Sequence, residues 1–460
     1  MTLRGFKLEE PKPRDRYATE RLASEVLRLA SCSLDPNVLH QAERCILDVM
    51  GCAIAGRTHP ATQAVSTVAK RHFPGGALHP WFLDETYGPI GVAYVNSIAA
   101  TILDLDDGNR QAMGHPGGAI VPAALALAQE LGSNKETLLR AIIAGYEVAV
   151  CIGTSEQRPS YHSGNYTSFG VAAAAALLKG LDSARIQHAL AICAYHGPRV
   201  SNLTLSTEMG SNVKESMAWS VVAGMIAADL AEAGFTGSRD ALDIEERIDG
   251  ASLSAALRPE PAIMRTYFKK YSCCRWIHSA TEALMHLMAA HDLEPSGIGA
   301  IRVETFHQAK SLNNQTDPQT LESAQYSVPF CMALAAVRGE TSLMPLTTSA
   351  LGDANVIDLA RRIAVVELDE MNALFPAQVP ARVTIETGAL TVVHRIDAPW
   401  GEASRPPPDA ELVEKVALLA RARISGELLT RIEAQLYGTQ DDLSPLFECL
   451  GPIKGIGCQA

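Results

Sequence analysis

Apolar residues recur at helical spacing through most of the first half of this chain, and this pattern constrains its fold more than any other feature. Asp35-Pro36 supplies an N-cap followed by a proline at the first helical position, and apolar residues then return every three or four positions until Gly56. Further helices are expected at 60–72, 89–103, 118–131, 167–179, 183–194 and 214–233. Several are apolar on every side, which is typical of helices in the middle of a bundle.

The pattern changes after about residue 265. Helices are expected at 276–291 and 318–337, and strands at 300–306, 363–368, 382–387 and 390–396. The last two strands flank Gly388, as in a hairpin. Helical periodicity returns at 409–436, after the proline-rich linker Arg405-Pro406-Pro407-Pro408.

This order of elements predicts a mainly α protein with two domains. We expect a large all-α domain built from both chain ends, residues 1–268 and 405–460. Residues 269–404 would form a smaller α+β domain inserted into it. A chain of 460 residues is long enough for both domains to bury a core.

Charge and composition disfavour two classes of partner. The net charge of −12 argues against a general nucleic-acid binder, which needs a basic surface to displace phosphate counterions. The chain lacks a run of roughly 18 uninterrupted apolar residues, so we expect no membrane span. The polar N-terminal segment has no apolar core like that of a signal peptide, and the ten cysteines form no C-x-x-C pair. We therefore expect a cytoplasmic protein with free, buried thiols.

Four polar stretches interrupt the apolar pattern, and the first joins an acidic run to a sharp turn. Asp104-Leu105-Asp106-Asp107 places three carboxylates within four residues, which is tolerable near cations or at a helix end. His115-Pro116-Gly117-Gly118 then breaks the chain and can present His115 from a loop. A solvated helix end followed by an ordinary turn is the alternative, and the residue types alone leave both interpretations open.

The second and third stretches each contain one candidate side chain. His162 precedes the apolar helix expected at 167–179, so it can reach a cleft where the helix N-terminus helps to hold an anion. Lys214 is predicted in the first turn of the helix at 214–233, where a cation opposes the helix dipole. A single local hydrogen bond for His162 and solvent exposure for Lys214 are the commoner alternatives.

The fourth stretch, residues 268–278, is the densest cationic cluster of the chain. Its candidate ligand-binding residues are Lys269, Cys274, Arg275 and His278. An arginine fork matches a carboxylate, so this stretch predicts binding of an anionic ligand.

Metal and nucleotide cofactors have little support in the sequence. His278, Glu282 and His286 share one helical face, but no second ligand group of recognisable spacing accompanies them, so we expect no metal site. The chain has no G-x-G-x-x-G after a strand, no P-loop and no G-x-S-x-G elbow. We therefore expect no cofactor.

Taken in order, these stretches resemble the MmgE/PrpD family. The resemblance spans roughly residues 18–440 and depends on the order and spacing of several segments. These are the acidic run, the His-Pro-Gly-Gly turn, Gly145-Tyr146-Glu147-Val148-Ala149, the His162 loop, Gly234-Phe235-Thr236-Gly237, Cys273-Cys274-Arg275-Trp276 and Ala324-Gln325-Tyr326-Ser327. Known members include 2-methylcitrate dehydratase, cis-aconitate decarboxylase and iminodisuccinate epimerase.

The resemblance implies a helical domain with an inserted α+β lid, a site in the cleft between them and a homodimer. Residue by residue, it implies the catalytic candidates Asp104, His115, His162, Lys214 and Tyr326, with Lys269 and Cys274 beside them. Two departures concern substrate choice. Gly108 stands where relatives often have a hydroxyl residue, and the loop after His162 is one residue short.

The reaction expected from this resemblance is proton transfer next to a carboxylate of a small polycarboxylate. Dehydration of a 2-hydroxy-polycarboxylate, as in 2-methylcitrate dehydratase, is the first expectation. Epimerisation of a substituted succinate and decarboxylation are the alternatives. A relative that binds a carboxylate without turning it over is a further alternative.

Overall fold

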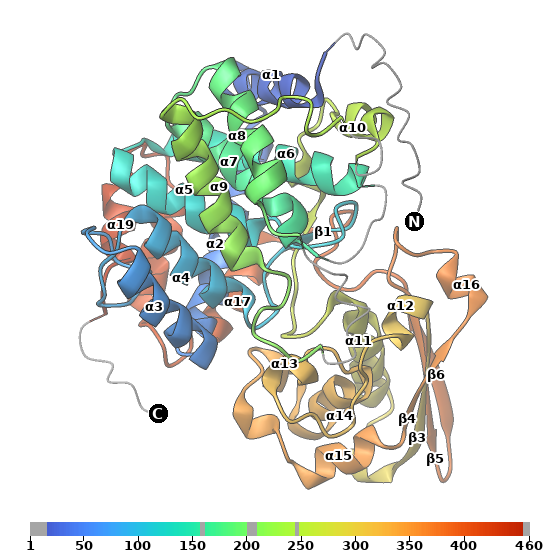
Figure 1. Ribbon diagram of the computed structural model, residues 1–460. Coiled ribbons are helices and arrows are strands. Elements are labelled where there is room, and N and C mark those ends of the chain that lie inside the picture. The colour runs from blue at the N-terminus through green and yellow to red at the C-terminus, as the bar shows by residue number, and fades with distance from the viewer. Residues whose placement is uncertain (1–15, 157–161, 200–208, 244–247, 454–460) are drawn as a thin grey trace, which may run out of the picture.

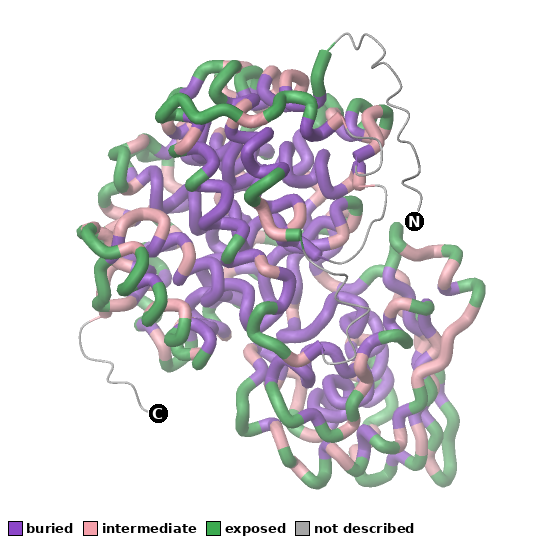
Figure 2. Tube along the Cα trace, viewed as in Figure 1, coloured by how far each residue is buried: buried purple, intermediate pink, exposed green. Residues whose placement is uncertain are grey.

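The computed structural model describes residues 16–156, 162–199, 209–243 and 248–453 (Figure 1). Two large hydrophobic cores divide most of them, and a smaller apolar cluster includes Cys52, Ile98 and Leu419. One core collects buried apolar side chains from 18–263, Phe268 and 412–450, and the other from 271–392 together with Met209. Buried chain runs through the interior of both parts in Figure 2. The protein is mainly α, as predicted, while the boundaries proposed at 268/269 and 404/405 and the lid arrangement stay predictions.

The first core is enclosed by helices from both ends of the chain. From the N-terminal side these are α1 (Ala18–Ser31), α2 (Pro36–Gly56), α3 (Pro60–His72), α4 (Pro89–Thr101), α5 (Gly117–Leu131), α6 (Lys135–Ser155), α7 (Gly164–Leu178), α8 (Ser183–His196), α9 (Met217–Glu232) and α10 (Gly250–Ala256). From the C-terminal side they are α17 (Asp409–Ala420), α18 (Gly426–Tyr437) and α19 (Ser444–Cys449). In Figure 1 the red C-terminal helices lie among the blue and cyan ones, and α17 and α18 both pack on α2.

A local signal explains where α2 begins, and burial explains why α6 is so apolar. Asp35 caps α2 by accepting a hydrogen bond from the Asn37 N–H, as the sequence predicted. By length and composition α6 could cross a membrane, but 83% of its most apolar window is buried inside the protein. We therefore interpret α6 as a core helix. The nine cysteines in the described residues are free thiols, and all but Cys32 are buried.

The second core is a small sheet covered by helices. The sheet has the strand order β4-β3-β5-β6, with β3 (Ile298–Thr305) parallel to β4 (Ile363–Glu367) and antiparallel to β5 (Ala381–Thr387). The predicted hairpin is confirmed, because β5 pairs antiparallel with β6 (Thr391–Ile396). The helices are α11 (Arg275–Ala290), α12 (His307–Lys310), α13 (Leu321–Ala324), α14 (Val328–Arg338), α15 (Ala354–Ala360) and α16 (Asp369–Asn372), with short 3-10 turns η3 (Pro295–Gly297), η4 (Glu340–Leu343) and η5 (Thr348–Ala350).

The helix expected at 318–337 is wrong as a single element. It is divided into α13 and α14, because Ser327 leaves the helical conformation and its side chain accepts a hydrogen bond from the Phe330 N–H. The break lets the chain turn between Gln325 and Ser327. This turn brings Gln325 and Tyr326 into the site described below.

The chain crosses between the two cores at two places that lie side by side. Before the first crossing, η2 (Ala262–Arg265) leads into β2 (Thr266–Tyr267), which pairs with β1 (Gly108–Asn109). The Phe268 N–H then donates to Gly401 O at 2.9 Å, which ties the outgoing segment to the returning one. Gly401 has φ 87°, and a Cβ there would lie 2.2 Å from Phe268 O, so this close approach requires glycine.

A buried carboxyl in α6 gives a prediction about stability. Glu147 is fully buried, and burial raises its pKa from 4.5 to about 7 although it accepts a hydrogen bond from the Ala262 N–H at 2.6 Å. As pH rises from 4.5 to 7 the unfolded chain ionises first, so folding loses stability in this window. Glu147→Gln is expected to stabilise the protein by about 3 kcal/mol at pH 8 but only about 1 kcal/mol at pH 5. Urea unfolding at both pH values measures this, and an equal gain at both would contradict it.

Candidate active site

The acidic run forms a buried loop directly after α4. Asp104 is 3% exposed, and Asp106 and Asp107 are fully buried. Asp104 has φ 53°, a left-handed conformation that is uncommon outside glycine and clusters at functional sites. After β1 and a short turn the chain returns and places His115, itself 1% exposed, beside this loop.

The two glycines of the His-Pro-Gly-Gly turn make room for the acidic loop. A Cβ at Gly117 would lie 1.9 Å from Asp107 Oδ1, and one at Gly118 would lie 2.5 Å from Asp106 Oδ2. Both carboxyl groups therefore pack closely against the first turn of α5. This contact explains why the acidic run and the glycine pair occur together.

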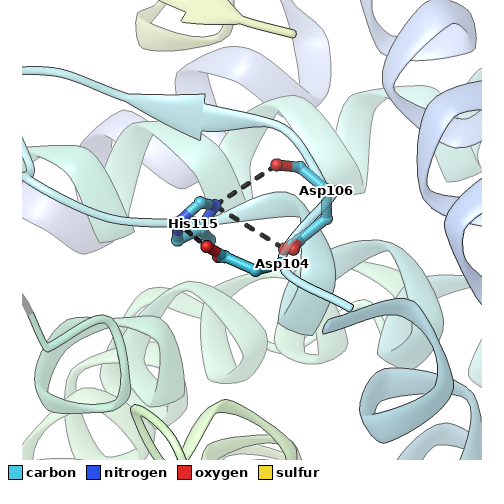
Figure 3. Close-up of side chains that lie close together, drawn as sticks. All are labelled: Asp104, Asp106 and His115. Carbon is cyan, nitrogen blue, oxygen red and sulfur yellow. Dashed lines mark hydrogen bonds and ion pairs between the residues drawn. The ribbon is translucent and has the colours of Figure 1, made fainter. Parts of the chain in front are cut away.

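Hydrogen bonding fixes the orientation of the His115 ring. Its Nδ1 lies 2.9 Å from Asp107 O, and a carbonyl oxygen can only accept, so Nδ1 carries a proton. The neutral ring then has an unprotonated Nε2, which lies 3.7 Å from Asp104 Oδ1. Figure 3 shows the ring between Asp104 and Asp106, whose Oδ2 is 3.9 Å from Nδ1. Nε2 is thus the atom of His115 that faces the carboxylate and can exchange a proton.

Two lysines from distant parts of the chain converge on Asp104. Lys269 Nζ lies 2.9 Å from Asp104 Oδ1 and is fully buried. Lys214 Nζ lies 3.7 Å from the same oxygen and donates to Gln325 Oε1 at 2.9 Å and to Thr101 O at 3.3 Å. The structure therefore brings Asp104, His115, Lys214 and Lys269 together in one buried cluster, although both lysines lie far from Asp104 in the sequence.

The helix predicted to begin at Lys214 begins at Met217 instead. Lys214 and Ser216 both have positive φ, 43° and 57°, which interrupts helical geometry before α9. Lys214 therefore lies in a turn, and the expectation of a lysine in the first helical turn is wrong. The turn directs its ammonium group toward Asp104.

The cluster separates the pKa values of neighbouring carboxyls. Burial alone would raise the pKa of Asp104, but Lys214 and Lys269 outweigh it and lower the pKa to about 2. Burial raises the pKa of Asp106 to about 6, against the opposing charges of His115 and Lys269. Burial and Asp48 together raise the pKa of Asp107 well above 3.8. Asp104 is thus ionised well below neutral pH, whereas Asp106 ionises only near pH 6.

Several polar atoms in the cluster have unused hydrogen-bonding capacity. Among the described residues, neither Asp104 Oδ2 nor the Tyr326 hydroxyl has a hydrogen-bond partner. Tyr326 is 3% exposed, and its ring centroid lies 5.7 Å from Lys214 Nζ. Burial, followed by the charge of Asp104, raises the pKa of Tyr326, so its hydroxyl stays protonated and can donate. Buried groups of this kind are usually paired, so the cluster is suited to a polar ligand.

A cavity of about 230 Å³ lies beside this cluster. Its walls come from α3, α4 and the segment 212–219, and they include both Lys214 and Thr101. Because Lys214 lines the cavity and also pairs with Asp104, the cavity extends to one edge of the cluster.

Three side chains of this region could in principle hold a metal ion. Asp104, Asp106 and His115 offer ligand atoms within 4.8 Å of one another. However, the ammonium groups of Lys214 and Lys269 already neutralise Asp104 and would repel a divalent cation. The charges present therefore suit an anion better than a metal ion, and the absence of a metal stays a prediction.

His162 lies in the loop before α7, next to residues that hold the cluster. Its Nε2 lies 3.4 Å from Glu156 Oε2. The neighbouring Ser163 accepts the His115 N–H at 2.8 Å, and its own N–H donates to Glu215 Oε2 at 2.8 Å. The loop is therefore connected to His115 and to the turn beside Lys214, while the catalytic role of His162 stays a prediction.

The cationic stretch 268–278 divides into two groups. Lys269 faces Asp104, and the buried Cys274 lies beside it, with its N–H donating to Gln325 O at 2.9 Å. Burial, together with Asp104, raises the pKa of Cys274, so its thiol stays protonated. The other group, Arg275 and His278, contacts different partners.

Arg275 is already paired in the structure. Its Nη2 lies 2.5 Å from Glu402 Oε1, and its Nη1 donates to Phe268 O at 3.2 Å and contacts His278 Nδ1 at 3.3 Å. Burial, followed by the charges of Arg275 and Lys269, holds the pKa of His278 well below its usual value. His278 is therefore neutral. The substrate-binding roles predicted for Arg275 and His278 stay untested, and the function proposed below does not use them.

Sequence reasoning missed two residues of the cluster. Gln325 is fully buried and links Lys214 to Ile102 O, to which its Nε2 donates at 3.0 Å. It stands next to Tyr326 in a segment that the family resemblance already marked. Asp106 was passed over within the acidic run, although its place beside the glycine pair distinguishes it from a surface acid.

Comparison with known proteins covers most of the chain. Residues 20–255 match the model of the MmgE/PrpD N-terminal domain, and residues 271–436 match that of the MmgE/PrpD C-terminal domain. A cis-aconitate decarboxylase from Aspergillus terreus is 23% identical over 485 residues, covering 96% of this chain and 98% of its own length. Cis-aconitate decarboxylase from Homo sapiens is 24% identical over 458 residues, covering 92% of each. The cis-aconitate decarboxylase-like protein oryM from Aspergillus oryzae is 23% identical over 469 residues, covering 93% and 96%.

Proposed function

The chain belongs to the MmgE/PrpD family, and from that premise we propose that it is a cofactor-independent lyase acting on a small di- or tricarboxylate. The convergence of Lys214 and Lys269 on Asp104, beside His115, is the observation that carries this proposal. Both ammonium groups share one oxygen of Asp104, and a substrate carboxylate would give them a second anionic partner.

Negative charge that develops on the substrate would be stabilised in the same place. When a bond to the carbon next to a carboxylate breaks, electron density spreads onto the carboxylate oxygens. Lys214 and Lys269 are fixed in a buried site where their charges act strongly. The protonated Tyr326 hydroxyl would donate to the same oxygens. Closure of the α+β part as a lid would exclude water.

Proton transfer is assigned to Nε2 of His115. The main-chain carbonyl of Asp107 holds Nδ1–H, which leaves Nε2 to deliver or remove the proton at carbon. Asp104 would orient the ring and stabilise its charged form. His162 is the second proton-transfer candidate, because its loop is connected to His115 through Ser163.

Decarboxylation of an unsaturated tricarboxylate is the first reaction to test, because the relatives described above are named cis-aconitate decarboxylases. The carbon–carbon bond to the leaving carboxylate breaks and carbon dioxide departs. The electron pair of that bond moves into the conjugated system held by the lysines, and the imidazolium form of His115, protonated at Nε2, delivers that proton to carbon. Dehydration, the first expectation from the sequence, is the second candidate. The departures at Gly108 and in the loop after His162 weaken the assignment of any of the best-known substrates of the family, so both reactions are tested on several compounds.

Proton NMR in D2O distinguishes these reactions. The protein would be incubated with cis-aconitate, citrate, 2-methylcitrate and a substituted succinate. Loss of carbon dioxide with a new methylene signal indicates decarboxylation, new alkene signals from a hydroxy acid indicate dehydration, and deuterium at the α-carbon alone indicates epimerisation. Thermal stabilisation by tricarboxylates with no turnover of any compound would instead indicate a binding protein and reject the proposal.

Two substitutions test the residue assignments. Lys214→Ala and His162→Ala are each expected to lower turnover by at least ~100-fold, since each removes a charge-stabilising or proton-transfer group. Lys70→Ala, at an exposed position of α3, is the control and should keep wild-type activity. Circular dichroism verifies that all three proteins are folded. Near-wild-type turnover of both site variants would reject these assignments.

A further inference from the structure

A second buried charge pair lies behind the acidic loop, outside the cluster that the proposed chemistry uses. Lys415 of α17 is 2% exposed, and its Nζ lies 2.5 Å from Oδ1 of the fully buried Asp48 in α2. The same ammonium group donates to Leu105 O at 3.0 Å. Leu105 stands between Asp104 and Asp106, so a residue of the C-terminal helix is bound to the main chain of the acidic loop.

This loop depends on side-chain donors for its shape. Asp104 has a left-handed backbone that a non-glycine residue keeps only where its surroundings impose it. Three side chains of the cluster region bind main-chain carbonyls before and after Asp104. Lys214 binds Thr101 O, Gln325 binds Ile102 O and His115 binds Asp107 O. Lys415 binds Leu105 O, the carbonyl that directly follows Asp104.

A purely structural ion pair would not require this last contact. Lys415 could neutralise Asp48 without touching the loop, and a buried pair is itself weak evidence of stabilisation. Donation to Leu105 O instead connects α17 to the position of Asp104. A shift of the loop would alter the 2.9 Å contact between Asp104 and Lys269 and the spacing to His115.

We propose that Lys415 is a positioning residue that fixes Asp104 through the Leu105 carbonyl. The proposal rests on the proposed function, because it assigns Asp104 to the active site. It means that the segment following the α+β part supplies a residue that the site needs. Lys415 itself does not touch the substrate.

Two changes separate positioning from simple stabilisation. In Asp48→Leu/Lys415→Met the buried pair becomes apolar, which is expected to leave the thermal midpoint within a few degrees of wild type. The donor to Leu105 O is still lost, so kcat should fall by about 30-fold, within the range for a displaced catalytic group. Asp48→Asn is the matched control. It breaks the ion pair but keeps Lys415 as a donor, so kcat should stay within about threefold of wild type.

Hydrogen exchange gives a readout that does not require turnover. Amides of residues 103–108 should exchange about tenfold faster in the double variant, while those inside α2 and α17 stay unchanged. If the double variant does not fold, Lys415→Met is compared with Asp48→Asn in the same two measurements. Three results would each overturn the proposal. The double variant could have the same kcat as wild type, the Lys415 and Asp48 variants could lose equal amounts of kcat, or exchange at 103–108 could stay unchanged. Absence of wild-type turnover would reject the proposed function and leave the exchange result to decide the role of Lys415.

Discussion

Replacing Lys269 by Met is expected to lower kcat/KM by about 10³-fold while the protein stays folded. Lys269 is fully buried and lies 2.9 Å from Asp104 Oδ1, so its charge acts in a medium of low dielectric constant. In the variant, Lys214 alone would face both Asp104 and a substrate carboxylate. The site would then lack one of the two cations that can pair with that carboxylate, and its capacity to stabilise developing negative charge would fall.

Steady-state kinetics on the substrate identified by NMR measures this loss. Lys270→Met is a close control, because Lys270 is the next residue but pairs with Glu340 at 2.7 Å in a partly exposed position. That variant should keep kcat/KM within about twofold of wild type, as expected for a partly exposed ion pair. If Lys269→Met retained more than a tenth of wild-type activity with normal unfolding, the charge argument for this site would be wrong.

The elements could be predicted from sequence where the signals are local. The cap at Asp35 and the apolar repeat after it fix α2, and the alternating runs on either side of Gly388 fix the β5–β6 hairpin. Prediction failed where a single residue changes the backbone. Ser327 divides one expected helix into two, and the positive φ of Ser216 delays the start of α9. Ser327 followed by Pro329 is a helix start signal that the apolar repeat concealed, whereas Ser216 gives no such signal.

The site could be predicted only in pieces. Each polar stretch was visible, but nothing in its spacing places Lys214 and Lys269 on the same carboxylate oxygen, because that contact depends on tertiary packing. The resemblance supplied the residues without their geometry. Within 268–278 the sequence also could not separate Lys269, which faces Asp104, from Arg275, which faces Glu402. The chain is irregular up to Cys274, so no helical periodicity relates Lys269 to Arg275 at the start of α11.

Removing Glu402 is expected to cause a large loss of stability. Glu402 is 7% exposed, and it accepts from Arg275 Nη2 at 2.5 Å and from Arg110 Nε at 2.8 Å. Arg275 and Arg110 overcome the effect of burial and hold the pKa of Glu402 below 4.5. Glu402→Leu leaves the buried Arg275 without its carboxylate. Breaking a buried pair in this way costs about 3–5 kcal/mol.

Urea unfolding at pH 7 measures this cost, and pH provides a check on its cause. A carboxyl whose pKa is lowered by folding stabilises the protein above its unfolded value of 4.5, and this contribution is lost as pH falls below it. The difference in the free energy of unfolding between wild type and Glu402→Leu should therefore be smaller at pH 3 than at pH 7. Glu136→Gln, which breaks an exposed pair with Arg140, should cost less than about 1 kcal/mol. A loss below 1 kcal/mol for Glu402→Leu would mean that Arg275 does not depend on Glu402. Arg275 would then be available to a substrate carboxylate, as the sequence first suggested.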